Sequence, residues 1–143
     1  FEETEGQMDI VHARARAVLG RYYACAKENE LAMQYYSGAL DILSNQADPH
    51  SAVEVAMLLG QVVSDAGRKD EAAEHYIDAL VLAEANDFRM LQGELLARLG
   101  EVESDRSQKM DYLQRSLSVF KELGAVDRMQ EVQTSVHRAV MGH

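Results

Sequence analysis

The sequence predicts an all-α protein built from a repeated pair of helices. Proline occurs once and glycine nine times among 143 residues, so long stretches can be helical without interruption. Runs of β-branched and aromatic residues of the kind that form strands are missing. A Leu-Gly pair recurs at Gly20, Gly60 and Gly100, and self-similarity at this constant period of 40 residues is typical of a helical repeat.

The clearest copy of the repeat spans residues 53–84. Gly60 lies within its first helical run, and Gly67 separates this run from the second. The small residues of the second run let neighbouring helices approach closely, and its large residues fill the space between them, so the pair is expected to pack as a hairpin. These residues are Ala72, Tyr76, Ala79 and Leu80.

This pattern of glycine, alanine and aromatic positions resembles the tetratricopeptide repeat, a helix–turn–helix unit of about 34 residues. Because the period here is 40 residues, longer loops or helix ends are expected, as in the extended arrays of signalling adaptors and large regulators. The resemblance implies a right-handed superhelix of about seven antiparallel helices with a concave inner face. Residues 1–143 are then expected to form a single domain that is a fragment of a longer array.

Repeat one is expected over 8–43, with helices over 8–27 and 30–43. Residues 1–6 align with 81–86 in the repeat register. We interpret them either as the tail of a preceding second helix or as a short disordered leader. The second helix of this repeat has the same packing positions as the clearest copy, which are Ala32, Tyr36, Ala39 and Leu40.

Repeat two is expected over 49–85, with helices over 49–66 and 70–85. The pair that precedes the first of these helices is a start signal. Asp48 can accept hydrogen bonds from free backbone N–H groups, and Pro49 suits the first turn because no N–H is needed there.

Repeat three is expected over 88–123, with helices over 88–103 and 107–123. Its turn is three residues shorter than the earlier turns, so Tyr112 is shifted off the aromatic position. The packing positions of the second helix are then expected at Leu113, Ser116 and Leu117.

A last helix is expected over 127–141, where valine recurs at every fourth position from Val132. It is either a capping helix that covers the open end of the stack or the first helix of a partial fourth repeat. His137 stands where the other repeats have glycine, which favours the capping helix.

Composition excludes several functional classes. The formal net charge of −10 weighs against binding to the phosphate backbone of a nucleic acid. No apolar stretch approaches the ~20 residues that span a bilayer, so no membrane association is expected. Cys25 is the only cysteine, which fits a reducing, cytoplasmic environment and predicts a small buried residue.

The sequence predicts no enzyme, no metal site and no cofactor. The histidines lack the i, i+4 spacing of a helical zinc site, and neither a CxxC pair nor a phosphate-binding glycine loop occurs. Glu74, His75 and Asp78 are the nearest approach to an acid–base group, but the repeat pattern places both carboxylates on an exposed face.

The resemblance implies a ligand groove lined by the first helix of each repeat. The positions carried over as partner-binding residues are Arg14, Arg21, Met57, Leu58, Gln61 and Arg98. They imply an apolar middle and arginines toward one end, where a guanidinium can hold a carboxylate through two hydrogen bonds. Ordinary surface ion pairs with glutamates are the alternative role of the arginines. The family's clamp for the C-terminal carboxylate of chaperone peptides is not expected, because only Arg98 agrees with it.

These observations predict a protein–protein interaction module, a scaffold or adaptor that binds a peptide or helix segment of a partner in its concave groove. The alternative is a regulatory sensor domain of a larger signalling or transcription-regulating protein, which responds to a peptide or small effector. Self-association through an exposed end of the stack is a further alternative.

Overall fold

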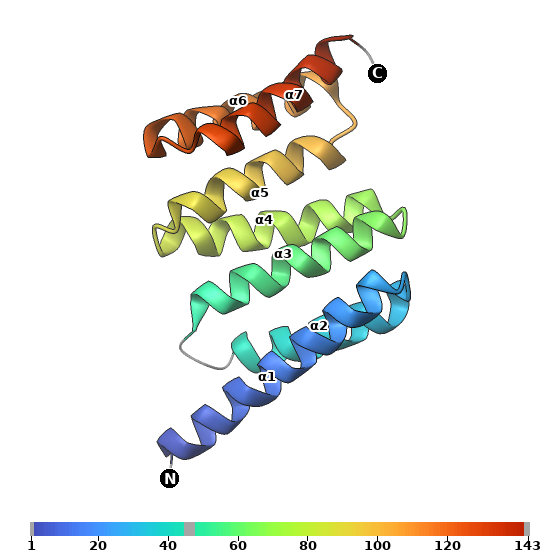
Figure 1. Ribbon diagram of the computed structural model, residues 1–143, viewed down its shortest axis with the longest axis vertical. Coiled ribbons are helices and arrows are strands. Elements are labelled where there is room, and N and C mark those ends of the chain that lie inside the picture. Colours follow the sequence, from blue (N-terminus) through green and yellow to red (C-terminus); the bar gives the residue numbers. More distant parts are fainter. Residues whose placement is uncertain (1, 45–47, 142–143) are drawn as a thin grey trace.

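The computed structural model describes residues 2–44 and 48–141, with side chains from residue 9 onward. Within these ranges the chain forms seven helices and no strand, and the helices are stacked along one long axis (Figure 1). The all-α prediction of about seven antiparallel helices is therefore confirmed. The helices are α1 (Glu2–Cys25), α2 (Asn29–Ser44), α3 (Pro49–Asp65), α4 (Lys69–Ala85), α5 (Arg89–Val102), α6 (Arg106–Leu123) and α7 (Val126–Met141).

Each helix packs mainly on its neighbours in the sequence. α1 with α2, α3 with α4 and α5 with α6 form hairpins, and α2–α3, α4–α5 and α6–α7 contacts join these hairpins into a stack. In addition, α3 contacts α5 directly. The odd-numbered helices consequently line one side of the stack, which we call the odd-helix face.

A glycine under a large side chain holds each hairpin together. A Cβ atom added at Gly60 of α3 would lie 2.6 Å from Cε1 of Tyr76 in α4, and one added at Gly20 would lie 2.7 Å from the ring of Tyr36. Both tyrosine side chains are buried. The absence of a Cβ atom is thus what lets the ring approach the backbone of the facing helix closely.

The third hairpin uses the same arrangement with a different residue. A Cβ atom at Gly100 would lie 2.6 Å from Cδ2 of Leu113, which takes the place of the tyrosines. Leu113 and Ser116 are buried, and the Ser116 hydroxyl donates to the Gly93 carbonyl oxygen at 2.7 Å. The shift of these positions that the shorter turn predicted is confirmed, and it arises because the loss of three residues moves the whole of α6 in register.

Capping groups lie at the helix starts and ends that the sequence predicted. The Ser51 N–H donates to Asp48 Oδ1 at 3.2 Å at the start of α3, and Pro49 occupies the first turn. Gly67 and Gly124 adopt left-handed backbone conformations, with φ of 85° and 69°. Glycine is favoured at both positions because a Cβ atom is strained there.

Two sequence expectations differ from the structure at the N-terminal end. Residues 2–6 belong to α1 itself and are neither the tail of a separate helix nor an irregular leader, because no proline or turn interrupts the chain before residue 8. Residue 1 lies outside the described residues. Cys25, in the last turn of α1, is exposed and not buried as the sequence predicted.

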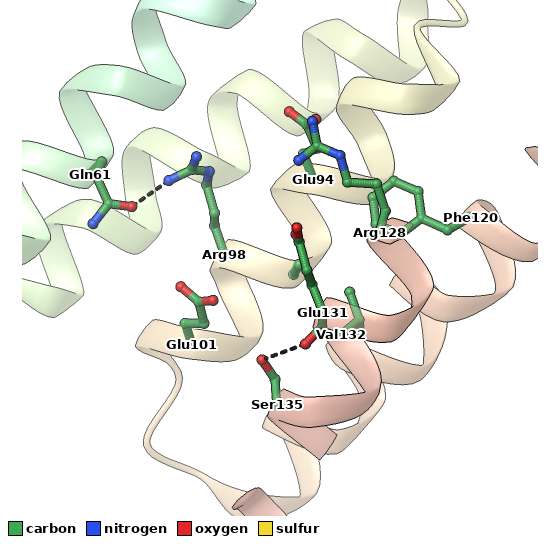
Figure 2. Close-up of a pocket in the computed structure, with 10 residues that line it drawn as sticks. Gln61, Glu94, Arg98, Glu101, Phe120, Arg128, Glu131, Val132 and Ser135 are labelled. Atoms are coloured by element: carbon green, nitrogen blue, oxygen red, sulfur yellow. Dashed lines mark hydrogen bonds and ion pairs between the residues drawn. The ribbon is translucent and has the colours of Figure 1, made fainter. Parts of the chain in front are cut away.

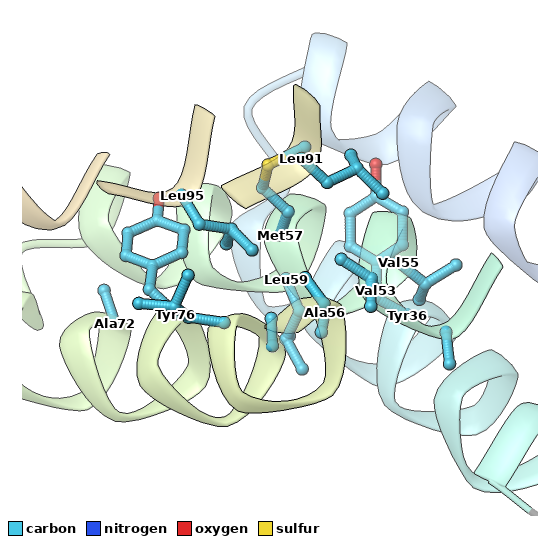
Figure 3. Close-up of a cluster of buried hydrophobic side chains, with 14 of the residues drawn as sticks. Tyr36, Val53, Val55, Ala56, Met57, Leu59, Ala72, Tyr76, Leu91 and Leu95 are labelled. Carbon is cyan, nitrogen blue, oxygen red and sulfur yellow. The ribbon is translucent and has the colours of Figure 1, made fainter. Parts of the chain in front are cut away.

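The core runs through the stack as one continuous cluster from α1 to α6, and Figure 3 shows the part of it that lies around α2, α3, α4 and α5. A second cluster, formed by Leu113, Phe120 and Val132, joins α6 to α7. Arg16 of α1 is an exception to the apolar pattern: its guanidinium lies over Gly38 of α2, where the missing side chain leaves room for it.

The glycine contact predicts a stability difference between two Gly→Ala variants. Gly60→Ala places a methyl group too close to the buried Tyr76 ring and should lower the free energy of unfolding by about 1–3 kcal/mol, despite the roughly 1 kcal/mol that alanine gains in a helix. Gly38→Ala meets only the flexible end of Arg16 and should be neutral or stabilising by up to about 1 kcal/mol. Urea unfolding followed by circular dichroism measures both, and equal effects would contradict the proposed packing role of Gly60.

Candidate functional site

The odd-helix face is divided in two by the contact between α3 and α5. Met57 of α3 points toward α5 beside Leu91 and is buried, with 8 % of its surface exposed (Figure 3). One hollow lies on each side of this contact. We call them the N-terminal hollow, between α1 and α3, and the C-terminal hollow, between α3, α5 and α7.

The N-terminal hollow has a volume of about 300 Å³ and a mainly apolar lining. Its apolar residues come from α1, α2 and α3 and are Ile10, Ala13, Ala17, Val18, Leu43, Val55 and Leu58. Val18 is 63 % exposed, so this surface is open to a partner. A side chain of a bound segment would gain free energy by leaving water here.

The charged side chains around the N-terminal hollow differ in whether they form an ion pair or a hydrogen bond within the protein. Asp48 accepts the capping hydrogen bond of α3, and Glu54 is paired with His50 at 2.8 Å. Arg14 and Arg21 line the same hollow, are exposed, and form no ion pair with any residue that the structure describes. The hollow therefore combines apolar walls with two exposed guanidinium groups that form no close ion pair with a described residue.

The C-terminal hollow has a similar volume, about 290 Å³, but a polar lining (Figure 2). Arg98 Nη1 donates to Gln61 Oε1, and Arg128 is paired with Glu94 at 2.9 Å. Two further carboxylates, of Glu101 and Glu131, line the hollow. Both arginines of this hollow are thus engaged within the protein.

Arg98 also lies beside the hydroxyl of Tyr76, the ring that covers Gly60. Burial raises the pKa of Tyr76, and the charge of Arg98 together with its contact to the hydroxyl partly offsets that rise. Tyr76, Arg98 and Gln61 consequently connect the core of the second hairpin with the surface of the C-terminal hollow.

The structure distributes the predicted binding residues over both hollows. Arg14, Arg21 and Leu58 lie in the N-terminal hollow, while Gln61 and Arg98 lie in the C-terminal hollow. Met57 lines neither. Its prediction as an accessible groove residue was wrong, because α5 approaches α3 closely enough to enclose it.

Sequence reasoning missed the contribution of α7. Glu131 and Ser135 follow Glu94 and Arg98 by 37 residues, which is the repeat period of 40 shortened by the three residues lost from the last turn. Extending the shortened register by one more repeat would have located them. Arg128, one turn earlier in α7, completes this side of the C-terminal hollow.

The part of the chain that the structure describes lacks two other kinds of site. No group of three or more histidine, cysteine, aspartate or glutamate side chains there could hold a metal ion. None of the described helices combines the length and the apolar character that a membrane span requires. Glu74 and Asp78 are exposed, and neither of them lines the N-terminal or the C-terminal hollow.

Comparison with known proteins shows the fold. No protein-family model matches the sequence, and no curated protein matches it. Several solved structures align with most of the chain. BtubC from P. vanneervenii has a TM-score of 0.81 and 18 % identity over 98 % of this chain and 65 % of its own. Aspartyl phosphate phosphatase F from Bacillus subtilis has a TM-score of 0.75 and 20 % identity over 93 % of this chain and 41 % of its own.

The third structure is a Rap protein complexed with competence and sporulation factor, with a TM-score of 0.72 and 19 % identity over 92 % of this chain and 40 % of its own. The likeness is one of fold. This chain therefore has the helical-repeat architecture of these proteins, and it spans between two-fifths and two-thirds of their length.

The cap at the edge of the N-terminal hollow predicts a pH-dependent stability. The hydrogen bond from the Ser51 hydroxyl is the largest cause that lowers the pKa of Asp48. The Ser51 N–H and the charges of Arg14 and His50 lower this pKa further, whereas partial burial of the carboxylate raises it. Because the pKa is lower in the folded protein, the carboxylate stabilises the fold above its unfolded pKa, and this stability is lost as the pH falls through the folded pKa.

Asp48→Ala should therefore lower the free energy of unfolding by about 1 kcal/mol at neutral pH and by less in acid. Asp48→Asn keeps an oxygen acceptor without the charge, so it should retain most of the capping energy and lose the pH dependence. Urea unfolding at neutral and acidic pH measures this. An Asp48→Ala effect that stays constant into acid would show that the carboxylate charge does not matter.

Proposed function

We propose that this chain is a protein-interaction module, acting as a scaffold or adaptor, that binds an extended or helical segment of a partner on the odd-helix face. The observation that carries the proposal is the N-terminal hollow. It is apolar, open and bordered by the available guanidinium groups of Arg14 and Arg21. Binding of this kind requires no catalytic group and no cofactor.

The fold comparison supports this proposal. The Rap protein that shares the fold is described as complexed with competence and sporulation factor. The same helical architecture is thus compatible with a bound factor. Two hollows separated by the Met57 contact would let a segment place one side chain on each side of the α3–α5 contact.

A second candidate function is that of a regulatory sensor domain within a larger signalling or transcription-regulating protein. It is favoured by the coverage of the matched structures, since this chain spans about 40 % of the Rap protein and of the aspartyl phosphate phosphatase. In such a domain a peptide or small effector would bind between the odd-numbered helices and change the spacing of the hairpins.

Selection from a displayed library of short random peptides tests the interaction module. Leu58→Glu places a charge on the apolar wall of the N-terminal hollow and should weaken binding of the selected peptides at least tenfold, a loss of about 1.4 kcal/mol or more. Val81→Glu is the matched control, because Val81 lies on α4, is 63 % exposed and lines neither hollow. Its binding should equal that of the wild type.

Recovery of no peptide, or peptides that Val81→Glu weakens as much as Leu58→Glu, would contradict binding on the odd-helix face. Small-angle X-ray scattering with and without a selected peptide then separates the two functions. A changed radius of gyration is expected of the sensor, and an unchanged one of the scaffold.

A further inference from the structure

α1 carries a line of exposed side chains that has the spacing of a coiled-coil seam. Its residues alternate at intervals of three and four positions, as the a and d positions of a heptad do. All of them are exposed, and none carries a formal charge. They are Val11, Ala15, Val18, Tyr22 and Cys25, which we call the α1 stripe.

The α1 stripe lies on the side of α1 that points away from the stack. Ala13 and Gly20 of α1 are buried, and Gly20 lies against the Tyr36 ring of α2. With about 100° of rotation per residue, the mean direction of the stripe lies about half a turn from these two residues. α1 is at one end of the stack, so this side faces outward (Figure 1). Within the stripe, only Val18 also lines the N-terminal hollow.

The repeat shows that part of this surface is covered in the other hairpins. Leu59 and Val62 of α3 are buried, and so are the corresponding residues of α5. Forty residues earlier the same positions of α1 are Leu19 and Tyr22, which are 41 % and 66 % exposed. α2 packs on α3 and α4 on α5, whereas no described helix precedes α1 in the stack. The outward side of α1 therefore has the character of a surface that another helix covers.

Tyr22 is held in place on this surface by its neighbours. Its ring meets the Tyr23 ring edge-on, with the ring centres 5.2 Å apart, and Tyr23 stacks on Tyr35 of α2 at 5.4 Å. An aromatic side chain that is already ordered loses little conformational freedom when it is buried in an interface. Such side chains are typical of the residues that contribute most to binding. The stripe thus has a preorganised anchor near its C-terminal end.

The opposite end of the stack does not offer a matching apolar surface. On α7, the side opposite the buried Val132 is formed by exposed polar residues, which include Asp127, Gln130, Thr134 and Arg138. A head-to-tail stack, with α7 of one copy on α1 of the next, would take these side chains out of water without providing partners for them. The surface that best matches the α1 stripe within this protein is therefore the α1 stripe itself.

We propose that the α1 stripe pairs with the same stripe of a second copy of this chain, so that the two α1 helices lie parallel and in register as a short coiled coil. Each layer of the seam is then formed by two copies of one residue, from Val11 at one end to Cys25 at the other. Because no residue of the stripe is charged, the pairing buries no charge. A two-fold contact of this kind is closed and gives a dimer. It goes beyond the proposed function, since it requires no ligand.

The charges that flank the stripe select the parallel arrangement. Arg14 and Arg21 hold the g positions, on the side of the N-terminal hollow, where the charge of Arg14 also acts on Asp48. In an antiparallel pair the g positions of the two helices meet, so Arg14 of one copy would approach Arg21 of the other. In a parallel pair each arginine approaches an e position instead, and these are Leu19 and Ala26. Like charges stay apart, and the arginine stems cover apolar side chains.

Sedimentation equilibrium of the full chain in reducing buffer tests the pairing. A reversible monomer–dimer equilibrium is expected in the micromolar range, since one pair of helices forms a small interface. Ala15→Glu places two carboxylates against each other in the middle of the seam and should weaken the dimer roughly tenfold or more. Val81→Glu is the matched control, because Val81 is an exposed residue of α4, and it should leave the dimer unchanged.

A second substitution at the same position should strengthen the dimer. Ala15→Ile adds a β-branched side chain at an a position, which favours parallel pairs, and should tighten the dimer roughly tenfold. Ala85→Ile makes the same change at an exposed alanine of α4 and should have no effect. Circular dichroism shows whether each variant is folded.

Charge-swapped variants show whether the partner is a second copy in register. Ala15→Glu and Ala15→Lys should each dimerise weakly alone, because like charges meet in the same layer. An equimolar mixture of the two should dimerise more tightly than either, because residue 15 of one copy then faces the opposite charge in the other.

Cys25 reports the direction of the two helices. It is the only cysteine of the sequence, so a disulfide-linked dimer must join two copies of it. Only the parallel arrangement brings these two thiols together across the two-fold axis. Diamide, which takes up the two electrons and two protons that the thiols lose, should cross-link the wild type and should cross-link Ala15→Glu much less at the same concentration.

The outcomes that would overturn the proposal are distinct. A chain that stays monomeric into the millimolar range would overturn it, as would a dimer that Ala15→Glu and Val81→Glu weaken equally. A charge-swapped mixture that dimerises no better than its components would overturn pairing in register. A dimer that diamide does not cross-link would overturn the parallel arrangement. Peptide binding at Leu58 is measured separately and stands if the dimer is absent, since Leu58 lies on α3 outside the stripe.

Discussion

The packing of a bare glycine backbone against a buried ring is the constraint on which the stack depends. At Gly20 and Gly60 the missing Cβ atom lets the tyrosine of the second helix lie against the first helix. At Gly100 a leucine does the same. Since interiors are close-packed, a single added methyl group at these points must displace a ring or separate two helices. The spacing within each hairpin follows from this contact.

The spacing between hairpins has a different origin, and it shapes the surface. α2–α3 and α4–α5 contacts hold successive hairpins together, and Met57 fills the additional contact between α3 and α5. This contact closes the middle of the odd-helix face and leaves a hollow on each side. The odd-helix face is thereby divided into an apolar part and a polar part.

Electrostatics distinguishes the two parts more clearly than shape does, since their volumes are nearly equal. In the polar part, Arg128 is neutralised by Glu94 and Arg98 is bonded to Gln61. In the apolar part, the arginines of α1 have no such partners, and the acids nearby serve the fold. Exposed charges of this kind contribute little to stability, because water already solvates them well.

The sequence by itself determined the seven helices, their ends except for the start of the first, and the positions that pack within each hairpin. These features depend on local rules: the 40-residue recurrence of glycine, the cap at Asp48, the stop at Gly67 and the shortened turn that moves Leu113 into the place of a tyrosine. Only the tertiary structure decided which face residues remain accessible. Met57 and Leu58 are adjacent in the sequence and were expected to share one groove, yet the approach of α5 encloses the first and leaves the second on the wall of a hollow. Accessibility and charge pairing depend on the distance between helices that are far apart in the chain, and no local pattern specifies that distance.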